Sequence, residues 1–93
     1  AGCRVALATD FNPGSCPCLD PLTILRLGCL QLRMTFEEAF TAMTLHAARS
    51  LRHADLGHLH PGAKAEVLLW EVEELLELVY WVGEPYRPRF LPA

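Results

Sequence analysis

The stretch VALATDFNPGS, residues 5–15, contains the clearest indication of fold in this chain. An apolar run over Val5–Thr9 ends at Asp10, and a turn with proline and glycine follows over residues 11–15. Apolar strands that lead into such turns are typical of buried parallel sheets, where functional groups gather at the carboxyl edge. We therefore predict a buried strand at Val5–Thr9 with Asp10 at its carboxyl end.

A helix is predicted over Pro21–Arg33, with proline in its opening position. Its side chains are apolar nearly all round, and only Arg26 and Arg33 mark a polar side. A helix of this kind is normally buried by surrounding structure. The chain offers one further convincing strand, at Glu66–Trp70, so most of the sheet that Val5–Thr9 would join is absent. Both features indicate a piece of a larger body.

The middle of the chain predicts two helices with a bend between them. Thr35 and Glu38 form a capping box, in which each side chain satisfies a backbone amide at a helix start. Apolar residues then recur at helical spacing as far as Ala47. Thr44 is placed to cap a second, short helix that runs to Leu51.

The last third of the chain predicts turns, the second strand and another helix. Gly57 and Pro61–Gly62 are turn signals that precede the strand. A helix is expected over Glu73–Tyr80, acidic on one side and apolar on the other. Residues 87–89 and 91–93 are predicted to be irregular.

Composition and charge narrow the classes of function. With 52% hydrophobic and 20% charged residues, the chain is typical of a globular protein and not of a disordered tail. The formal net charge is −3 and no Lys/Arg cluster exists, so we expect no nucleic-acid binding. No apolar run approaches the roughly 20 residues that span a bilayer, and no signal-peptide pattern is expected. These features favour a cytoplasmic protein without a membrane segment.

The cysteines are confined to the first third of the chain: Cys3, Cys16, Cys18 and Cys29. An even count can indicate a disulfide framework in a small secreted domain. Here Cys16 and Cys18 are too close for easy mutual bridging, so we predict reduced thiols. No second Cys/His pair stands at zinc spacing, which favours coincident small residues near a pocket rim over a structural zinc site.

The octapeptide ATDFNPGS, residues 8–15, resembles the signature that follows the last barrel strand in imidazolonepropionases of the amidohydrolase superfamily. Further matches follow in family order: Leu32–Thr35 with Glu37–Ala39, Thr44 with Ala47–Arg49, Gly57 and Gly62 around Leu59, Ala65–Glu66 with Trp70, and Glu77–Tyr80. The resemblance covers nearly all of residues 4–83. The DFNPG stretch is its most specific part, whereas the later helix and strand patterns are similar to those of the wider superfamily.

The resemblance implies an α/β fold, an interrupted metal-dependent hydrolase (β/α)8 barrel with a small β-rich domain built from both chain ends. Residues 1–56 would be the end of the barrel, with strand 8 and the helices after it. Residues 57–93 would return toward the β-rich domain and add a strand to it. The chain departs from the family pattern at Cys16, Cys18 and Ala63–Lys64, and in a truncated or divergent end over Pro85–Ala93.

Asp10 carries the main functional prediction. At a barrel mouth, a carboxylate can ligate a divalent metal and accept a proton from its bound water, whose pKa the metal lowers to roughly 7. The resemblance implies this catalytic and metal-binding role for Asp10, with zinc or iron as the ion. From spacing alone, the competing interpretation is an aspartate that forms the turn before Asn-Pro-Gly.

Asn12, Gly14 and Ser15 are the predicted substrate-binding residues. The carboxamide of Asn12, the backbone amide of Gly14 and the hydroxyl of Ser15 can hydrogen-bond a planar polar ring or its propionate. Glycine also lets the backbone approach a ligand closely. Without the resemblance, an ordinary Asn-Pro-Gly turn is the favoured interpretation of the same residues.

The pair His58-x-His60 is similar to the amidohydrolase metal motif. In the family that pair lies at the end of the first strand, far upstream of the eighth. Its position here, between two turn signals, favours a surface turn. His46 and His53 are isolated, and we expect them at the surface or in helix packing.

The expected function is hydrolytic ring opening of 4-imidazolone-5-propanoate to N-formimino-L-glutamate, a step of histidine degradation. Its partners would be this substrate, water and the missing N-terminal barrel with the remaining metal ligands; a homodimer is left open. A single carboxylate cannot hold a catalytic ion, so we expect the chain alone to be inactive. Two alternatives stay open: a non-catalytic remnant or interaction module, and another amidohydrolase such as a deaminase.

Overall fold

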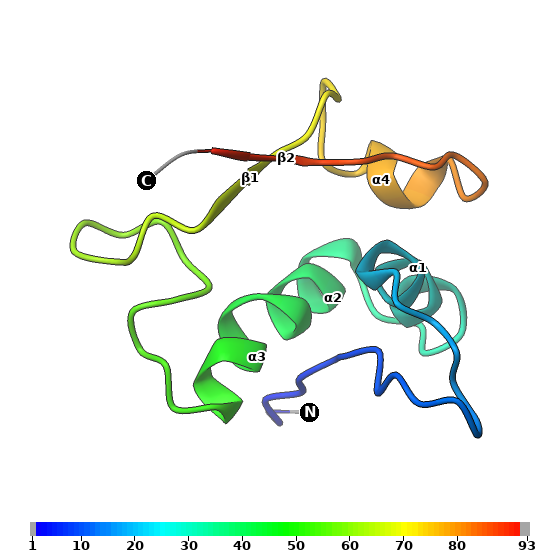
Figure 1. Cartoon of the computed structure of the whole chain (residues 1–93), viewed down its shortest axis with the longest axis horizontal. Coiled ribbons are helices and arrows are strands. Elements are labelled where there is room, and N and C mark those ends of the chain that lie inside the picture. Colours follow the sequence, from blue (N-terminus) through cyan, green and yellow to red (C-terminus); the bar gives the residue numbers. More distant parts are fainter. Residues whose placement is uncertain (1, 92–93) are drawn as a thin grey trace.

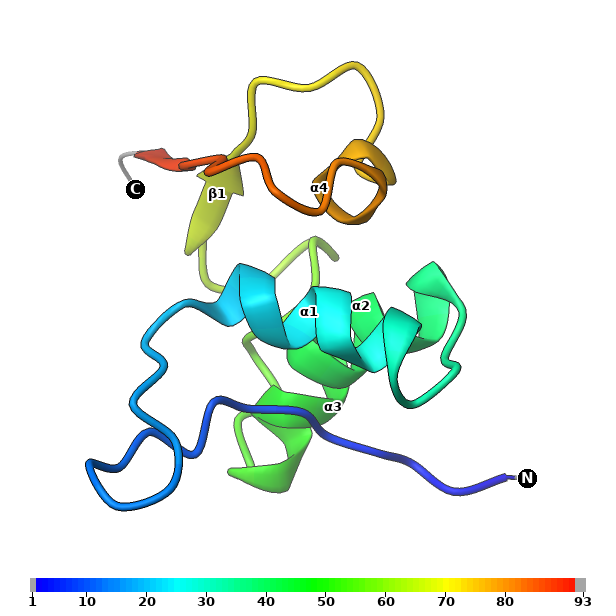
Figure 2. The ribbon, with the colours of Figure 1, turned by 90° about the vertical axis from the view of Figure 1, so that its right-hand side faces the viewer.

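Four short helices and a two-stranded antiparallel sheet form the structure of residues 2–91, the part of the chain that the computed structural model describes (Figure 1). In chain order they are α1 (Pro21–Leu30), α2 (Phe36–Met43), α3 (Leu45–Ser50), β1 (Val67–Leu69), α4 (Glu77–Tyr80) and β2 (Arg89–Leu91). The sheet and α4 lie on one side of the molecule, and α1–α3 lie on the other (Figures 1 and 2). This mixed arrangement is compatible with a fragment of an amidohydrolase.

The N-terminal segment is not a strand, so the prediction of a strand at Val5–Thr9 is wrong for this chain. The segment instead runs past α2 and α3 (Figure 2). The Leu7 amide donates to the Ala42 carbonyl at 3.0 Å, and the His46 ring lies 3.2 Å from the Val5 carbonyl. A strand needs a neighbouring strand for its hydrogen bonds, and residues 2–91 place none beside this segment.

Helix α1 begins where the sequence predicted, because Asp20 caps it. One carboxylate oxygen of Asp20 accepts from the Leu22 amide at 3.1 Å and the other from the Thr23 hydroxyl at 3.0 Å. The helix ends at Leu30, three residues before the predicted end, and Arg33 beyond it has a positive φ of 55°. Among residues 2–91, no helix is long and apolar enough to cross a membrane.

The predicted capping box and bend are confirmed. The Glu38 amide donates to the Thr35 hydroxyl at 3.1 Å, and the Thr35 amide donates to the Glu38 carboxylate at 2.8 Å. The bond from the Thr35 backbone amide to the Glu38 carboxylate, and to a lesser extent the Thr35 hydroxyl, hold the pKa of Glu38 below its ordinary value. The bend falls at Thr44, as expected, but the Thr44 hydroxyl donates back to the Phe40 carbonyl at 2.8 Å and does not cap α3.

The core lies where α1, α2 and α4 meet. Its buried cluster consists of Leu22, Leu25, Ala39, Leu78 and Val79. Gly28 on α1 allows α2 and the N-terminal segment to approach closely. A Cβ at this position would lie 3.0 Å from Leu7 and 3.3 Å from Ala39, closer than side chains normally pack.

Arg26 does not form the polar side of α1, and that prediction is wrong. Its side chain is only 8% exposed. The Nε group donates to the Leu78 carbonyl at 2.8 Å, and Nη2 donates to the Trp81 and Glu84 carbonyls at 2.8 Å each. A buried charge needs such partners, and here they come from α4 and the turn after it.

The C-terminal third contains one confirmed strand and two corrections. The predicted strand at Glu66–Trp70 forms as β1, but Arg89–Leu91, expected to include irregular positions, is a strand that pairs with it antiparallel. The predicted helix over Glu73–Tyr80 is formed only as α4. The Glu77 carboxylate accepts from the amides of Glu73 and Glu74 at 2.9 and 3.0 Å, which stabilises a turn before the helix. Pro92 and Ala93 lie outside the described residues.

Many large apolar side chains remain exposed for a chain of this size. On and after α1 they include Leu27, Leu30 and Leu32, with Leu30 at 56% and Leu32 at 61% exposure. The prediction that this apolar helix needs more surrounding structure agrees with these values, because a helix that is apolar all round cannot bury every face against two neighbours.

Candidate functional site

Residues 12–16 form a tight turn closed by two backbone hydrogen bonds. The Asn12 amide donates to the Cys16 carbonyl at 2.9 Å, and the Cys16 amide donates to the Asn12 carbonyl at 3.2 Å. The predicted substrate-binding residues therefore lie in one small loop, directly after Asp10.

The Asn12 carboxamide organises this loop from within. Its Oδ1 atom accepts from the Gly14 amide at 3.0 Å, the Ser15 amide at 2.7 Å and the Ser15 hydroxyl at 3.2 Å. Its Nδ2 group donates to the Asp10 carbonyl at 2.9 Å. Asparagine commonly forms turns with its own backbone in this way. Asn12 thus acts as a turn former here, and its binding of substrate stays a prediction.

Asp10 has an unusual backbone conformation, with a positive φ of 49°. Aspartate is one of the few residues that tolerate this left-handed region. The residue is exposed, and within residues 2–91 its carboxylate takes part in no ion pair or side-chain hydrogen bond. Just before it, the Thr9 carbonyl accepts from the half-buried Cys16 thiol at 3.0 Å.

Three polar groups of the turn retain hydrogen-bonding capacity for a ligand. A carboxamide NH2 has two hydrogens, and Asn12 uses one of them within the turn. The Ser15 hydroxyl donates to Asn12 but can still accept. The Asp10 carboxylate adds an exposed anionic acceptor. Gly14, by contrast, already donates its only amide hydrogen to Asn12.

The described residues do not by themselves form a metal site, and the predicted role of Asp10 as a metal ligand stays a prediction. No group of three or more His, Cys, Asp or Glu in residues 2–91 is arranged to hold a metal ion. Catalytic zinc sites use three protein ligands and keep one position for water or substrate. Asp10 is chemically suited to supply one ligand, because its carboxylate is exposed and has no competing cation.

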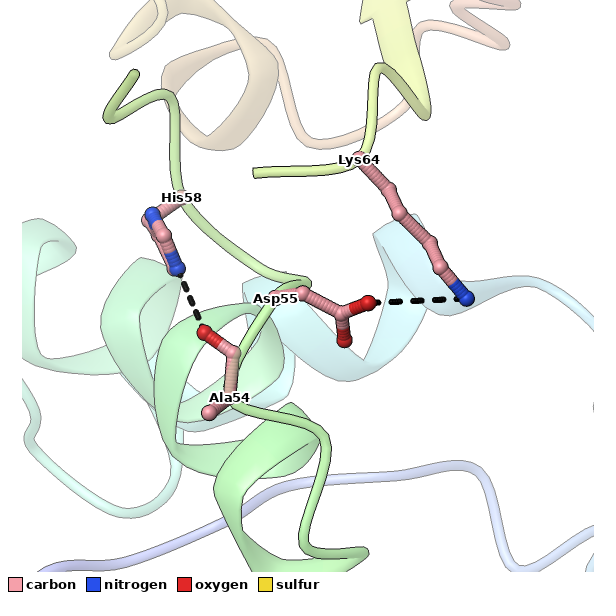
Figure 3. Close-up of polar contacts among 4 residues, drawn as sticks. All are labelled: Ala54, Asp55, His58 and Lys64. Atoms are coloured by element: carbon pink, nitrogen blue, oxygen red, sulfur yellow. Dashed lines mark hydrogen bonds and ion pairs between the residues drawn. The ribbon is translucent and has the colours of Figure 1, made fainter. Parts of the chain in front are cut away.

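The His58-x-His60 pair lies in a turn between α3 and β1, as predicted, and Figure 3 shows His58 in this turn. His58 Nε2 lies 2.8 Å from the Ala54 carbonyl, and His58 Nδ1 accepts from the His60 amide at 3.3 Å. Both ring nitrogens of His58 are therefore used inside the turn. Beside them, Lys64 forms an ion pair with Asp55 at 3.5 Å (Figure 3). His46 contacts the N-terminal segment, which agrees with its predicted role in packing.

Cavities of about 360 and 250 Å³ lie beside the N-terminal segment, and His46 lines both. The larger is lined by Cys3, Val5, Met34, Glu37, Glu38, Thr41 and His46, and the smaller by Arg4, Ala6, His46, Arg49 and Ser50. Neither includes a residue of the Asp10–Cys16 turn. The turn is thus an exposed loop in the described chain.

The four cysteines are free thiols, as predicted. Burial, and to a lesser extent the nearby Glu37 carboxylate, raise the pKa of Cys29 above its ordinary value. The bond from Cys16 to Thr9 was not anticipated, because no spacing rule links a cysteine to a carbonyl seven residues earlier.

Comparison with known proteins gives a consistent set of relatives. The chain is 40% identical over 93 residues to an imidazolonepropionase of Maricaulis maris, covering 98% of this chain and 23% of the relative. It is 44% identical over 82 residues to that of Ruegeria sp., and 43% over 84 residues to that of Geobacillus sp., covering 88% and 89% of this chain and 20% of each relative. No family model matches the chain.

The chain therefore spans about a fifth of the length of the curated relatives it matches. Their shared name places the chain in the amidohydrolase class. It belongs to the imidazolonepropionase family, as a C-terminal fragment.

Proposed function

We propose that a protein containing this chain opens the ring of 4-imidazolone-5-propanoate with water to give N-formimino-L-glutamate, in histidine degradation. The observation that carries this proposal is the 40–44% identity to curated imidazolonepropionases over 86–98% of the chain. We further propose that residues 1–56 close a (β/α)8 barrel supplied by the rest of the protein.

In this proposal Asp10 is the catalytic residue and one ligand of a zinc or iron ion. When bound, such an ion makes hydroxide available near neutral pH. The Asp10 carboxylate can also hold a proton taken from the attacking water. Its exposure and lack of a competing cation support this role.

The neighbouring turn would bind and orient the substrate. The remaining Nδ2 hydrogen of Asn12 can donate to a ring carbonyl or to the propionate, and the Ser15 hydroxyl can accept from a ring N–H. The Gly14 amide donates to Asn12, so its contact with a substrate would require that bond to be exchanged. Of the predicted binding residues, Asn12 and Ser15 are therefore the better supported.

The test is an assay of imidazolonepropionate hydrolysis by the protein that contains this chain and its upstream barrel. We expect activity that a strong chelator removes and that added zinc or iron restores. We expect the 93-residue chain alone to show no rate above that of the free metal. Full activity in the chelated protein would overturn the metal-dependent proposal.

A second candidate is an interaction module without catalysis. The exposed apolar residues on and after α1, with Leu27 at 44% and Leu30 at 56% exposure, favour it. Such surface normally seeks a partner or aggregates. This alternative would be supported if the native chain bound an unrelated protein stably and a variant with Asp10 replaced bound it equally well.

A further inference from the structure

Asp10 lies between two peptide groups whose carbonyls are both held by side chains of the turn. The Thr9 carbonyl, before Asp10, accepts from the Cys16 thiol at 3.0 Å. The Asp10 carbonyl, after it, accepts from Asn12 Nδ2 at 2.9 Å. Each residue has only two soft backbone dihedrals, so fixing the peptide planes on both sides of a Cα atom fixes its φ and ψ. Cys16 and Asn12 therefore set the direction in which the Asp10 side chain leaves the backbone.

The conformation held in this way is one that needs support. Asp10 has a φ of 49°, in a region that residues with a Cβ atom seldom occupy. Sparsely populated conformations persist where the surrounding structure over-determines them, and they cluster at functional sites. The Asp10 carboxylate forms no ion pair within residues 2–91, so the support comes from the two carbonyl contacts and not from its own charge.

We propose that Cys16 and Asn12 are positioning residues that aim the Asp10 carboxylate at the metal. This inference rests on the proposed metal-binding role of Asp10. Cys16 gives the cleaner test, because Asn12 is also a predicted substrate contact. The Cys16 thiol is half-buried and directed at the Thr9 backbone, so its removal deletes one contact of the turn and no substrate contact.

The experiment uses the protein that contains the whole barrel, with three substitutions. Cys16→Ala removes the donor, and Cys16→Ser keeps a donor of similar size. Cys18→Ala is the matched control, since the Cys18 thiol contacts the Asp20 carbonyl at 3.6 Å and not the residues that flank Asp10. Zinc affinity is measured by competition with a chelator, and kcat and KM are measured with imidazolonepropionate.

We expect Cys16→Ala to weaken zinc binding by roughly 10-fold, the lower end of the range for groups that orient a metal ligand. The value of kcat should fall with it, while KM stays within about twofold. Cys16→Ser should restore both, because a hydroxyl also donates. Cys18→Ala should match the native protein. Zinc affinity of Cys16→Ala within twofold of native would overturn the inference.

Asp10→Asn separates the two proposals. If it leaves zinc affinity unchanged, the metal-binding role of Asp10 fails, and the positioning inference fails with it. If it weakens zinc binding and Cys16→Ala does not, only the positioning inference fails. Should Cys16→Ala not fold, Cys16→Val takes its place, because valine fills the volume without a donor. The same loss of zinc affinity, rescued in Cys16→Ser, is then expected.

Discussion

Two polar regions of this chain are built in opposite ways. In the Asp10–Cys16 turn every side-chain partner lies within seven residues along the chain, and the loop is largely exposed. Arg26 instead binds carbonyls 52, 55 and 58 residues away, and it is buried. The turn can form from local sequence, whereas the Arg26 contacts exist only after α1 and α4 have packed together.

The Asp10–Cys16 turn is the region suited to chemistry, whereas the Arg26 contacts stabilise the fold. The turn keeps hydrogen-bonding groups free for a ligand, and its strained residue is an exposed carboxylate. Arg26, by contrast, is buried, and no buried polar side-chain atom of residues 2–91 is left without a hydrogen-bond partner. A buried guanidinium whose Nε and Nη2 groups bind backbone carbonyls holds segments together.

The largest expected effect is that of replacing Asp10, in the region suited to chemistry. Asp10→Asn, in the protein with its barrel, should weaken zinc binding by more than about 100-fold, because changes to groups that only orient a ligand already lower affinity by 10–100-fold. Chelator competition measures this loss. Asp20→Asn is the control, since Asp20 caps α1 and the Oδ1 atom of an asparagine can still accept from the Leu22 amide, while its Nδ2 group can donate to the Thr23 hydroxyl. Equal effects of the two substitutions would break the distinction.

At the structural end, Arg26→Met should lower the free energy of unfolding by about 2–4 kcal/mol, because three carbonyls lose their donor and some are left unsatisfied. Urea unfolding followed by the fluorescence of the two tryptophans, Trp70 and Trp81, would measure it. Arg26→Lys should recover little, because an ammonium group cannot span the same fork. The exposed Arg33→Met should change stability by less than about 0.5 kcal/mol.

Gly57 tests a contact between the 54–60 turn and the α2–α3 bend. The sequence separation of this contact lies between those of the Asp10–Cys16 turn and those of Arg26. It has a φ of 81°, and a Cβ there would lie 2.5 Å from the Thr44 carbonyl oxygen. Gly57→Ala should therefore destabilise by more than the roughly 1–2 kcal/mol of left-handed strain alone. Gly62→Ala, with φ 93° and no atom within 4 Å, should show the strain only. Thermal or urea unfolding of both variants compares them, and an equal loss would remove the packing argument.

The smallest expected effect concerns the capping box. The pKa of Glu38 is lowered by its bonds to Thr35, so the ionised form is favoured in the folded state. Its contribution is present above the ordinary pKa of 4.5 and is lost as the pH falls through the lowered folded value. Thr35→Ala should lower stability by about 1 kcal/mol at neutral pH and return the Glu38 pKa toward 4.5. NMR titration of the Glu38 carboxylate checks this. Because alanine keeps the backbone amide that also binds Glu38, an unchanged pKa would exclude only the Thr35 hydroxyl as a cause.

Much of the local structure was predictable, for reasons visible in single residues. The Thr35–Glu38 box, the bend at Thr44 and the turn at His58–His60 all use partners within four residues. The strand at Val67–Leu69 is apolar and follows a Pro-Gly turn. The short helix over Glu77–Tyr80 was overestimated, because the periodicity of residues 73–80 does not reveal that Glu77 turns back to bind the amides of Glu73 and Glu74.

The members of the Asp10–Cys16 turn were predictable from the sequence, but the internal geometry of that turn was not. Sequence brought Asp10, Asn12, Gly14 and Ser15 together because they are consecutive. It did not show that the Asn12 carboxamide is engaged by its own turn, or that Cys16 holds the Thr9 carbonyl. A thiol has no spacing rule comparable to that of an asparagine in a turn, so Cys16 was assigned only as a small residue near a rim.

By itself the sequence determined the elements whose hydrogen bonds close within a few residues: the capped helices, the Asn12 turn and the family to which they belong. Only the tertiary structure decided that Arg26 is buried, that Arg89–Leu91 pairs with Val67–Leu69, and that Val5–Thr9 lies along helices instead of in a sheet. The physical reason is the same in each case. A charged side chain, the edge of a strand or an apolar segment has several possible partners. Which one it contacts depends on segments far away along the chain.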